Sequence, residues 1–226
     1  TAFWTQLDER LEVILEFFKK RYDIIRRQKC SSNPLAFTQG GFYEGTKDPD
    51  DEVGDLVRYM TASFGITALD EATFLWTGKR LLEEGGAFSE EVLRHLQARI
   101  NVFKKEDGWL YAIYGESLCA TQAKQYDAFC AKQGIDNVFR HTPHYSPEYF
   151  TNSFHVNVTE EITPFEKQDH EFKDFHLCEG GHIQYVRLDN PENTDAVKAV
   201  IQRGMELGFY QGVNFDSAYC GDCGTH

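Results

Sequence analysis

The stretch that decides the fold is residues 180–215, which read GGHIQYVRLDNPENTDAVKAVIQRGMELGFYQGVNF. Residues 183–188 and 209–215 are rich in β-branched and aromatic side chains, which favour strands. Between them, residues 195–207 carry apolar side chains at helical spacing, and Gly208 can end that helix. A strand, a helix and a second strand in this order are typical of a parallel βαβ unit. This stretch therefore predicts an α/β protein.

The rest of the chain continues the alternation of strands and helices. Helical spacing predicts helices over residues 6–29, 70–84, 89–105 and 118–132, and short apolar or β-branched runs predict strands over residues 60–66, 109–114 and 150–156. The sequence thus predicts five strands in all. Asp70 is expected to cap one helix, and either Asn193 or Thr194 another. Residues 37–54 have the composition of a loop.

The charge balance limits the partners of this chain. Its 36 acidic and 23 basic residues give a net charge of -13. Duplex nucleic acids are bound by basic surfaces, so no nucleic-acid partner is expected. No run approaches the roughly 18 apolar residues of a membrane span, and no membrane partner is expected either. A single nucleotide stays compatible, because backbone N–H groups at a helix N-terminus can hold a phosphate without a basic side chain.

Six cysteines are present, and their spacing indicates the redox setting. They are Cys30, Cys119, Cys130, Cys178, Cys220 and Cys223. A small secreted domain held by disulfides would be shorter and denser in cysteine, so we expect a reducing, cytoplasmic setting. The first four are isolated and are interpreted as small buried apolar residues.

The last two cysteines form a Cys-x-x-Cys motif, Cys220-Gly221-Asp222-Cys223. Two thiolates at this spacing can bind one tetrahedral zinc ion, and the glycine permits a tight turn. A structural zinc site needs four ligands, of which this chain offers two, or three if His226 contributes. A redox dithiol has the same spacing, although such motifs normally lie near the start of a fold. Zinc is favoured, and a redox role or no special role stays open.

A second candidate is the segment AIYGESL at residues 112–118. A predicted strand runs through Gly115 and Glu116 into a helix. The free N–H groups at that helix start, with the Ser117 hydroxyl, could hold a phosphate. The alternative is an ordinary helix start capped by Ser117, with Glu116 complementing the helix dipole. Spacing alone favours the ordinary helix start.

The third candidate is the segment TNSFH at residues 151–155. As a strand, it would place Thr151, Ser153 and His155 on one face, and Asn152 and Phe154 on the other. Polar side chains in a barrel interior are costly unless they are paired or bind a ligand, whereas a half-exposed strand needs neither. The spacing of the histidines between residues 141 and 182 fits no helix-borne metal pair, so no histidine metal site is predicted.

Taken together, several strings resemble one family in their order and approximate spacing. They are TASFGI at 61–66 followed by Leu69, GESL at 115–118, FTNSFHV at 150–156, GGHI at 180–183, YQGVN at 210–214 and CGDCG at 220–224. The series is similar to the C-terminal half of the catalytic subunit of anaerobic (class III, glycyl-radical) ribonucleoside-triphosphate reductases. The resemblance runs from about residue 10 to the end, and TNSFH and GGHI are its most specific parts.

The resemblance implies a fold and a division of the chain. The fold is a five-stranded half of a ten-stranded glycyl-radical-enzyme α/β barrel with surrounding helices. Residues 1–215 would form the C-terminal half of the barrel, and residues 216–226 the truncated start of a zinc-binding module. In this module Cys220 and Cys223 carry over as two of four zinc ligands.

The resemblance also implies a reaction, in which ribonucleotides become 2′-deoxyribonucleotides through glycyl and thiyl radicals. Its partners would be the ribonucleotide, an iron–sulfur radical-SAM activase and a second copy of the chain in a homodimer. Four residues carry over as the turn that presents a helix N-terminus to the substrate phosphates: Gly115, Glu116, Ser117 and Leu118. Three carry over as residues lining the barrel: Asn152, Ser153 and His155.

No catalytic residue is assigned in this chain. The thiyl cysteine is expected upstream of Thr1, and a second Cys-x-x-Cys and the radical glycine loop are expected beyond His226. This piece alone is therefore not expected to catalyse the reaction. Two alternatives remain: a glycyl-radical enzyme of the formate-lyase type, which the Cys220/Cys223 pair disfavours, or a non-catalytic nucleotide-binding fragment.

Overall fold

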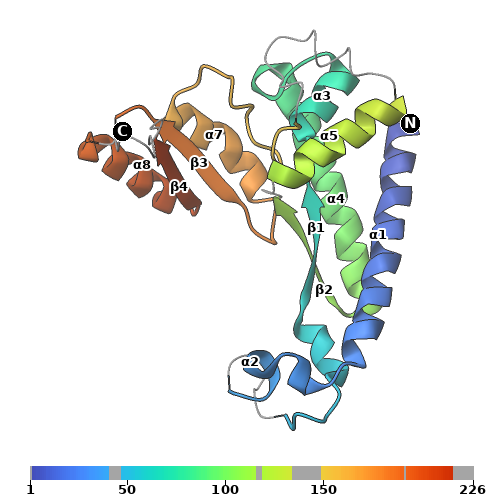
Figure 1. Ribbon diagram of the computed structural model, residues 1–226. Helices are drawn as coiled ribbons and strands as arrows, with labels where there is room; N and C mark the ends of the chain where they lie inside the picture. Colours follow the sequence, from blue (N-terminus) through green and yellow to red (C-terminus); the bar gives the residue numbers. More distant parts are fainter. Residues whose placement is uncertain (1, 41–46, 116–118, 134–148, 191, 216–226) are drawn as a thin grey trace. The chain divides into compact units, whose positions relative to one another are not determined.

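The computed structural model describes residues 2–40, 47–115, 119–133, 149–190 and 192–215. The chain divides into two compact units, one of residues 1–64 with 98–112 and the other of residues 65–97 with 113–226 (Figure 1). Within the described residues, no helix combines the length and the apolar character that crossing a bilayer requires. Each unit is described by itself below.

The first unit is organised by the long helix α1 (Ala2–Arg26), which confirms the helix predicted over residues 6–29. Leu11, Leu15, Phe18 and Tyr22 recur three or four residues apart and are buried, because they share one face of the helix. The Phe18 ring packs edge-on against Phe64, with 5.0 Å between ring centroids. The apolar face of α1 therefore supplies much of this unit's core.

Short elements complete the first unit. Helical turns cover Cys30–Ser32 and Gly54–Tyr59, and the four-residue helix α2 (Pro34–Phe37) lies between them. The strands β1 (Thr61–Ile66) and β2 (Leu110–Gly115) pair in a two-stranded sheet, and α4 (Gly86–Asp107) precedes β2. These three elements run across the boundary between the units, and they confirm the two strands and the helix predicted there.

The helix predicted over residues 70–84 is wrong in its second half. The helix α3 (Leu69–Thr77) ends at Gly78, whose φ of 72° is favourable for glycine, and a short kinked turn follows at Leu81–Gly85, where Glu83 has non-helical dihedral angles. Asp70 is not the cap that the sequence predicted. It lies inside the first turn of α3, where its buried Oδ1 accepts a hydrogen bond of 3.0 Å from the Leu81 N–H. The carboxylate thus holds the turn that follows the helix.

The second unit contains the predicted βαβ unit. The strands β3 (Ile183–Leu188) and β4 (Tyr210–Phe215) pair in parallel, and α8 (Thr194–Glu206) connects them. Asn193 is the cap of α8, because its side chain accepts a hydrogen bond from the Ala196 N–H. The predicted helix over 118–132 is α5 (Cys119–Gln133).

The two faces of the β3–β4 pair differ in their neighbours. The register places Gln184 beside Gln211, and Gln211 also accepts a hydrogen bond from Gln168 of the helix α7 (Pro164–Phe175). This is therefore the face that the helices cover. Side chains alternate along a strand, so Tyr185 and Gly212 lie on the opposite face.

Two corrections follow for the predicted architecture. Residues 150–156 form no strand, so the described residues hold four strands, arranged as two separate pairs. The helix α7 was missed, although Thr163 and Glu166 form a capping box and Pro164 occupies its first turn. The mixed α/β class is confirmed, whereas the ten-stranded barrel stays a prediction. Residues 216–226, the predicted start of a zinc module, lie outside the described residues.

Candidate functional site

The site is built around the loop of residues 151–157 in the second unit. Ser153 has a φ of 49°, which breaks the extended conformation that a strand would need. The loop carbonyls of Thr151 and Ser153 accept hydrogen bonds of 3.0 and 3.1 Å from the N–H groups of Ala68 and Leu69, at the start of α3. The expected alternation of faces is wrong as well, because Ser153 and Phe154 are both fully buried.

A buried carboxyl holds the first end of this loop. Glu71 Oε1 accepts two hydrogen bonds of 2.7 Å from Thr151, one from its N–H and one from its hydroxyl. The Thr151 hydroxyl in turn accepts one from the Asn157 amide, at 2.8 Å. Burial raises the pKa of Glu71 from 4.5 to about 7, although the hydrogen bonds from Thr151 oppose this shift.

A second buried carboxylate, Glu171 of α7, holds the other end. Its Oε1 lies 2.9 Å from His155 Nδ1 and 2.5 Å from Lys167 Nζ, and it accepts a hydrogen bond of 3.2 Å from the Val156 N–H. Burial favours the neutral acid, but the charge of Lys167 and the interactions with His155 and His182 outweigh it and hold the pKa of Glu171 well below its ordinary range. The loop is therefore fixed by an ionised glutamate paired with a lysine.

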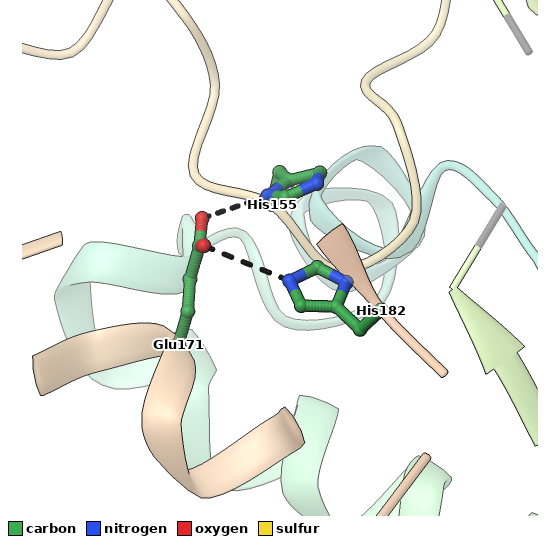
Figure 2. Close-up of side chains that lie close together, drawn as sticks. All are labelled: His155, Glu171 and His182. Atoms are coloured by element: carbon green, nitrogen blue, oxygen red, sulfur yellow. Dashed lines mark hydrogen bonds and ion pairs between the residues drawn. The ribbon is translucent and has the colours of Figure 1, made fainter. Parts of the chain in front are cut away.

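His182, two residues after Gly180, stands beside this carboxylate. Its Nε2 lies 3.8 Å from Glu171 Oε2, beyond hydrogen-bond distance, and neither ring nitrogen has a hydrogen-bond partner among the described residues. Its ring stacks on Phe154, with centroids 4.1 Å apart. Burial lowers the pKa of His182 to about 4, so the ring is neutral at pH 7. Figure 2 shows the two imidazoles facing one oxygen each of Glu171.

His155, Glu171 and His182 carry the donor types of a metal site, and their ligand atoms lie within 4.8 Å of one another. The Lys167 ammonium, however, contacts Glu171 Oε1 and lies 3.5 Å from His155 Nδ1. It already supplies the positive charge that this buried carboxylate requires. The arrangement favours a hydrogen-bonded charge network over a metal site.

Gly115 brings a second predicted segment to the same place. Its N–H donates to the Gly181 carbonyl at 3.0 Å, and the Gly180 N–H donates to the Ile113 carbonyl at 2.7 Å. A Cβ atom on Gly115 would stand 2.7 Å from His182 Nδ1 and 2.8 Å from Ser153 Oγ. A glycine is required here because the backbone approaches both side chains so closely.

A pocket of about 700 Å³ opens beside this cluster. Asn152 and His155 line it from the loop, Lys167 from α7, and Tyr185 and Arg187 from β3. Further lining side chains come from residues 149–164, and Asn214 comes from β4. Amides, the guanidinium of Arg187 and an aromatic ring on one concave surface are suited to a small polar, anionic ligand.

The structure thus gathers several of the residues that the sequence singled out. Gly115 and Ser153 meet at His182, and Asn152 and His155 line the adjacent pocket. Five others lie outside the described residues: Glu116, Ser117, Leu118, Cys220 and Cys223. Sequence reasoning missed Glu71, Lys167 and Glu171. For the last two, the Thr163-Pro164-x-Glu166 capping box was a signal that could have revealed their helix.

Comparison with known proteins places this chain in a family. The family model described as anaerobic ribonucleoside-triphosphate reductase matches residues 1–226. The chain belongs to this family. The resemblance based on short strings is therefore confirmed over the whole chain, and the formate-lyase type of enzyme is not the group that it matches.

Individual reductases show how much of such a protein this chain represents. It is 28% identical over 225 residues to the anaerobic ribonucleoside-triphosphate reductase of phage T4, covering 96% of this chain and 34% of the relative. The enzymes of Salmonella typhimurium and Escherichia coli are 27% and 26% identical over 238 residues each, covering 99% of this chain and 32% and 31% of the relatives. The chain spans about a third of the length of these curated relatives.

Proposed function

We propose that this chain forms the C-terminal part of the catalytic subunit of an anaerobic ribonucleoside-triphosphate reductase. The whole protein would convert ribonucleotides to 2′-deoxyribonucleotides by glycyl and thiyl radical chemistry. The observation that carries the proposal is the family match over all 226 residues. The relatives are named for ribonucleoside triphosphates, which favours the triphosphate as substrate.

Within that reaction, the role of this chain is to bind and orient the nucleotide. The pocket lined by Asn152 and His155 has the size and polarity for it, and the buried pairs behind it fix the loop that carries both residues. Gly115 lies directly before residues 116–118, which we propose bind the phosphates. The cysteine thiyl radical generated by the glycyl radical would supply hydrogen abstraction, and the residues of this chain would hold the ribose and keep water away from it.

The partners follow from the same proposal. An iron–sulfur radical-SAM activase would install the radical, and the full-length protein would be a homodimer. A ten-stranded barrel would enclose the pocket, and the βαβ unit with helices on one face of β3 and β4 supports this architecture. A reducing, cytoplasmic setting is supported by Cys30, Cys130 and Cys178, which are buried and free.

Zinc is proposed as a structural cofactor, held by Cys220 and Cys223 with two further ligands from the whole protein. The donor chemistry fits, since a pair of thiolates at this spacing is typical of half of a four-cysteine zinc site. The exchange Cys220→Ser in the full-length protein should release the ion, because three ligands bind it less tightly and the thiolate is lost. Metal analysis after dialysis tests this, and full zinc occupancy in the variant would refute the ligand assignment.

The function is tested with the full-length protein and its activase under strict exclusion of oxygen. We expect a glycyl-radical signal by electron paramagnetic resonance and formation of labelled deoxyribonucleotide from a labelled ribonucleoside triphosphate, with protein lacking the activase as control. A protein that shows the radical but forms no deoxyribonucleotide contradicts the proposal. If it still binds the triphosphate, the non-catalytic nucleotide-binding alternative is then correct.

A further inference from the structure

The face of the β3–β4 pair that α7 leaves uncovered carries an unusual arrangement of side chains. In the parallel register, Tyr185 lies beside Gly212, and Arg187 beside Asn214. Neighbouring side chains in register point to the same face, so these residues form one surface. Tyr185, Arg187 and Asn214 all line the pocket described above.

The Tyr185 ring closely approaches the neighbouring strand β4 at Gly212. A Cβ atom on Gly212 would stand 2.5 Å from both Cδ1 and Cε1 of the ring, closer than any real side chain allows. Glycine weakens a strand, because it has no side chain to pack and gains more freedom on unfolding. Here it leaves room for the ring beside β4, while Tyr185 stays 37% exposed and lines the pocket.

Shielding of a glycine backbone by an aromatic ring is the purely structural reading of this pair. The side chains around the Tyr185 ring indicate a role in ligand binding as well. Arg187, two residues along β3 and exposed, has no hydrogen-bond or ion-pair partner among the described residues. Successive residues on one strand face are about 6.6 Å apart, so Arg187 follows Tyr185 on the same face of β3.

The charge of the pocket also favours an anionic ligand. The chain carries a net charge of -13, yet the pocket is lined by the cationic Arg187, while the charge of Lys167 is balanced by Glu171. Glu160, an acidic residue among those lining it, is already paired with Arg80. A guanidinium without a partner among the described residues, in a chain of net negative charge, favours an anion, and a planar π surface beside it favours a flat ring.

We propose that Tyr185, beside Gly212, is a stacking platform for the base of a nucleoside triphosphate, and that Arg187 pairs with its phosphates. This inference rests on the proposed function and assigns binding residues that lie outside the predicted turn at 115–118. Asn214, beside Arg187 in the register, offers an amide to the ribose or to the base edge. The ring of His155, whose centroid is 6.5 Å from that of Tyr185, closes the pocket on the loop side.

The test uses the activated full-length reductase and two probes, a ribonucleoside triphosphate as substrate and inorganic tripolyphosphate as competitor. Tyr185→Leu removes the π surface and should raise the KM about tenfold, within the range measured for base stacking on aromatic rings, with unchanged inhibition by tripolyphosphate. Tyr185→Phe keeps the ring and should restore the KM. Arg187→Gln should raise both the KM and the inhibition constant of tripolyphosphate, because its contact is with phosphate.

Three further variants complete the test. Gly212→Ala displaces the ring without changing Tyr185, and should raise the KM in the same direction. Tyr59→Leu and Lys198→Gln are controls at exposed positions outside this pocket and should leave both constants unchanged. If Tyr185→Leu and Gly212→Ala both keep the KM of the wild-type enzyme, the stacking platform is refuted.

If the proposed function is wrong, the wild-type protein itself forms no deoxyribonucleotide, which distinguishes this outcome from a failure of the platform alone. In that case the platform is judged by equilibrium dialysis of a labelled triphosphate against the wild-type protein and Tyr185→Leu. Weaker retention by the variant supports the platform. Equal retention, or none by either protein, refutes it.

Discussion

The exchange Glu71→Gln should flatten the dependence of stability on pH. Burial raises the pKa of Glu71 from 4.5 to about 7. A group whose pKa is higher in the folded state stabilises the fold below its unfolded pKa, and this contribution is lost as the pH rises through the folded value. The loss therefore falls between about pH 4.5 and pH 7, and the difference between the two pKa values corresponds to about 3 kcal/mol.

The amide oxygen of the introduced glutamine would still accept both hydrogen bonds from Thr151, but the side chain would not ionise. Between pH 5 and pH 8, the wild-type protein should lose about 2 kcal/mol more stability than Glu71→Gln. Other shifted groups, such as Asp174, whose pKa burial raises to about 7, are present in both proteins and cancel in this comparison.

Urea unfolding followed by circular dichroism at pH 5 and pH 8 measures the effect. The exposed Glu84 provides a matched control, since Glu84→Gln makes the same chemical change on the surface. Equal stability changes in the wild type and in Glu71→Gln would show that Glu71 does not titrate in this range. The assignment of a protonated carboxyl beneath the 151–157 loop would then be wrong.

Two further predictions concern the cluster around His182. Gly115→Ala should destabilise the protein by about 1–3 kcal/mol, because its methyl group would stand within 2.8 Å of two buried side chains; an unchanged urea midpoint would contradict the close approach. Glu171→Gln should cost about 3 kcal/mol, because the largely buried Lys167 loses its counter-charge. Adding Lys167→Met should recover part of this loss in thermal unfolding, and a double variant no more stable than Glu171→Gln would argue against a charge pair.

The helices and strands of this fold could be predicted where the apolar residues recur with a single clear period. The face of Leu11, Leu15, Phe18 and Tyr22 has helical spacing, and it revealed α1 correctly. The βαβ unit was predictable for the same reason, since its strands and helix are separated by clear caps and glycines. In these segments local preference and tertiary burial agree.

The 151–157 loop could not be predicted, because its conformation depends on distant carboxylates. FTNSFHV has the composition of a strand, but its backbone finds partners in Glu71, Glu171 and the start of α3. The first of these lies 80 residues away in sequence. A hydrogen bond from such a distance leaves no local periodic signal, so residue preference favoured the wrong conformation.

The same long-range hydrogen bonds explain why the residues of the candidate site lie close together. The two ends of the loop are held by acids of opposite character: Glu71 is protonated over much of the range below pH 7, and Glu171 is ionised and paired with Lys167. The side chains between them, Asn152 and His155, are thereby fixed at the pocket wall without any strand pairing. A polar loop anchored from two helices can present its side chains to a ligand at positions that a regular strand, with its strict alternation, would turn to opposite faces. This explains why TNSFH looks like a strand in sequence and yet serves the pocket as a rigid loop.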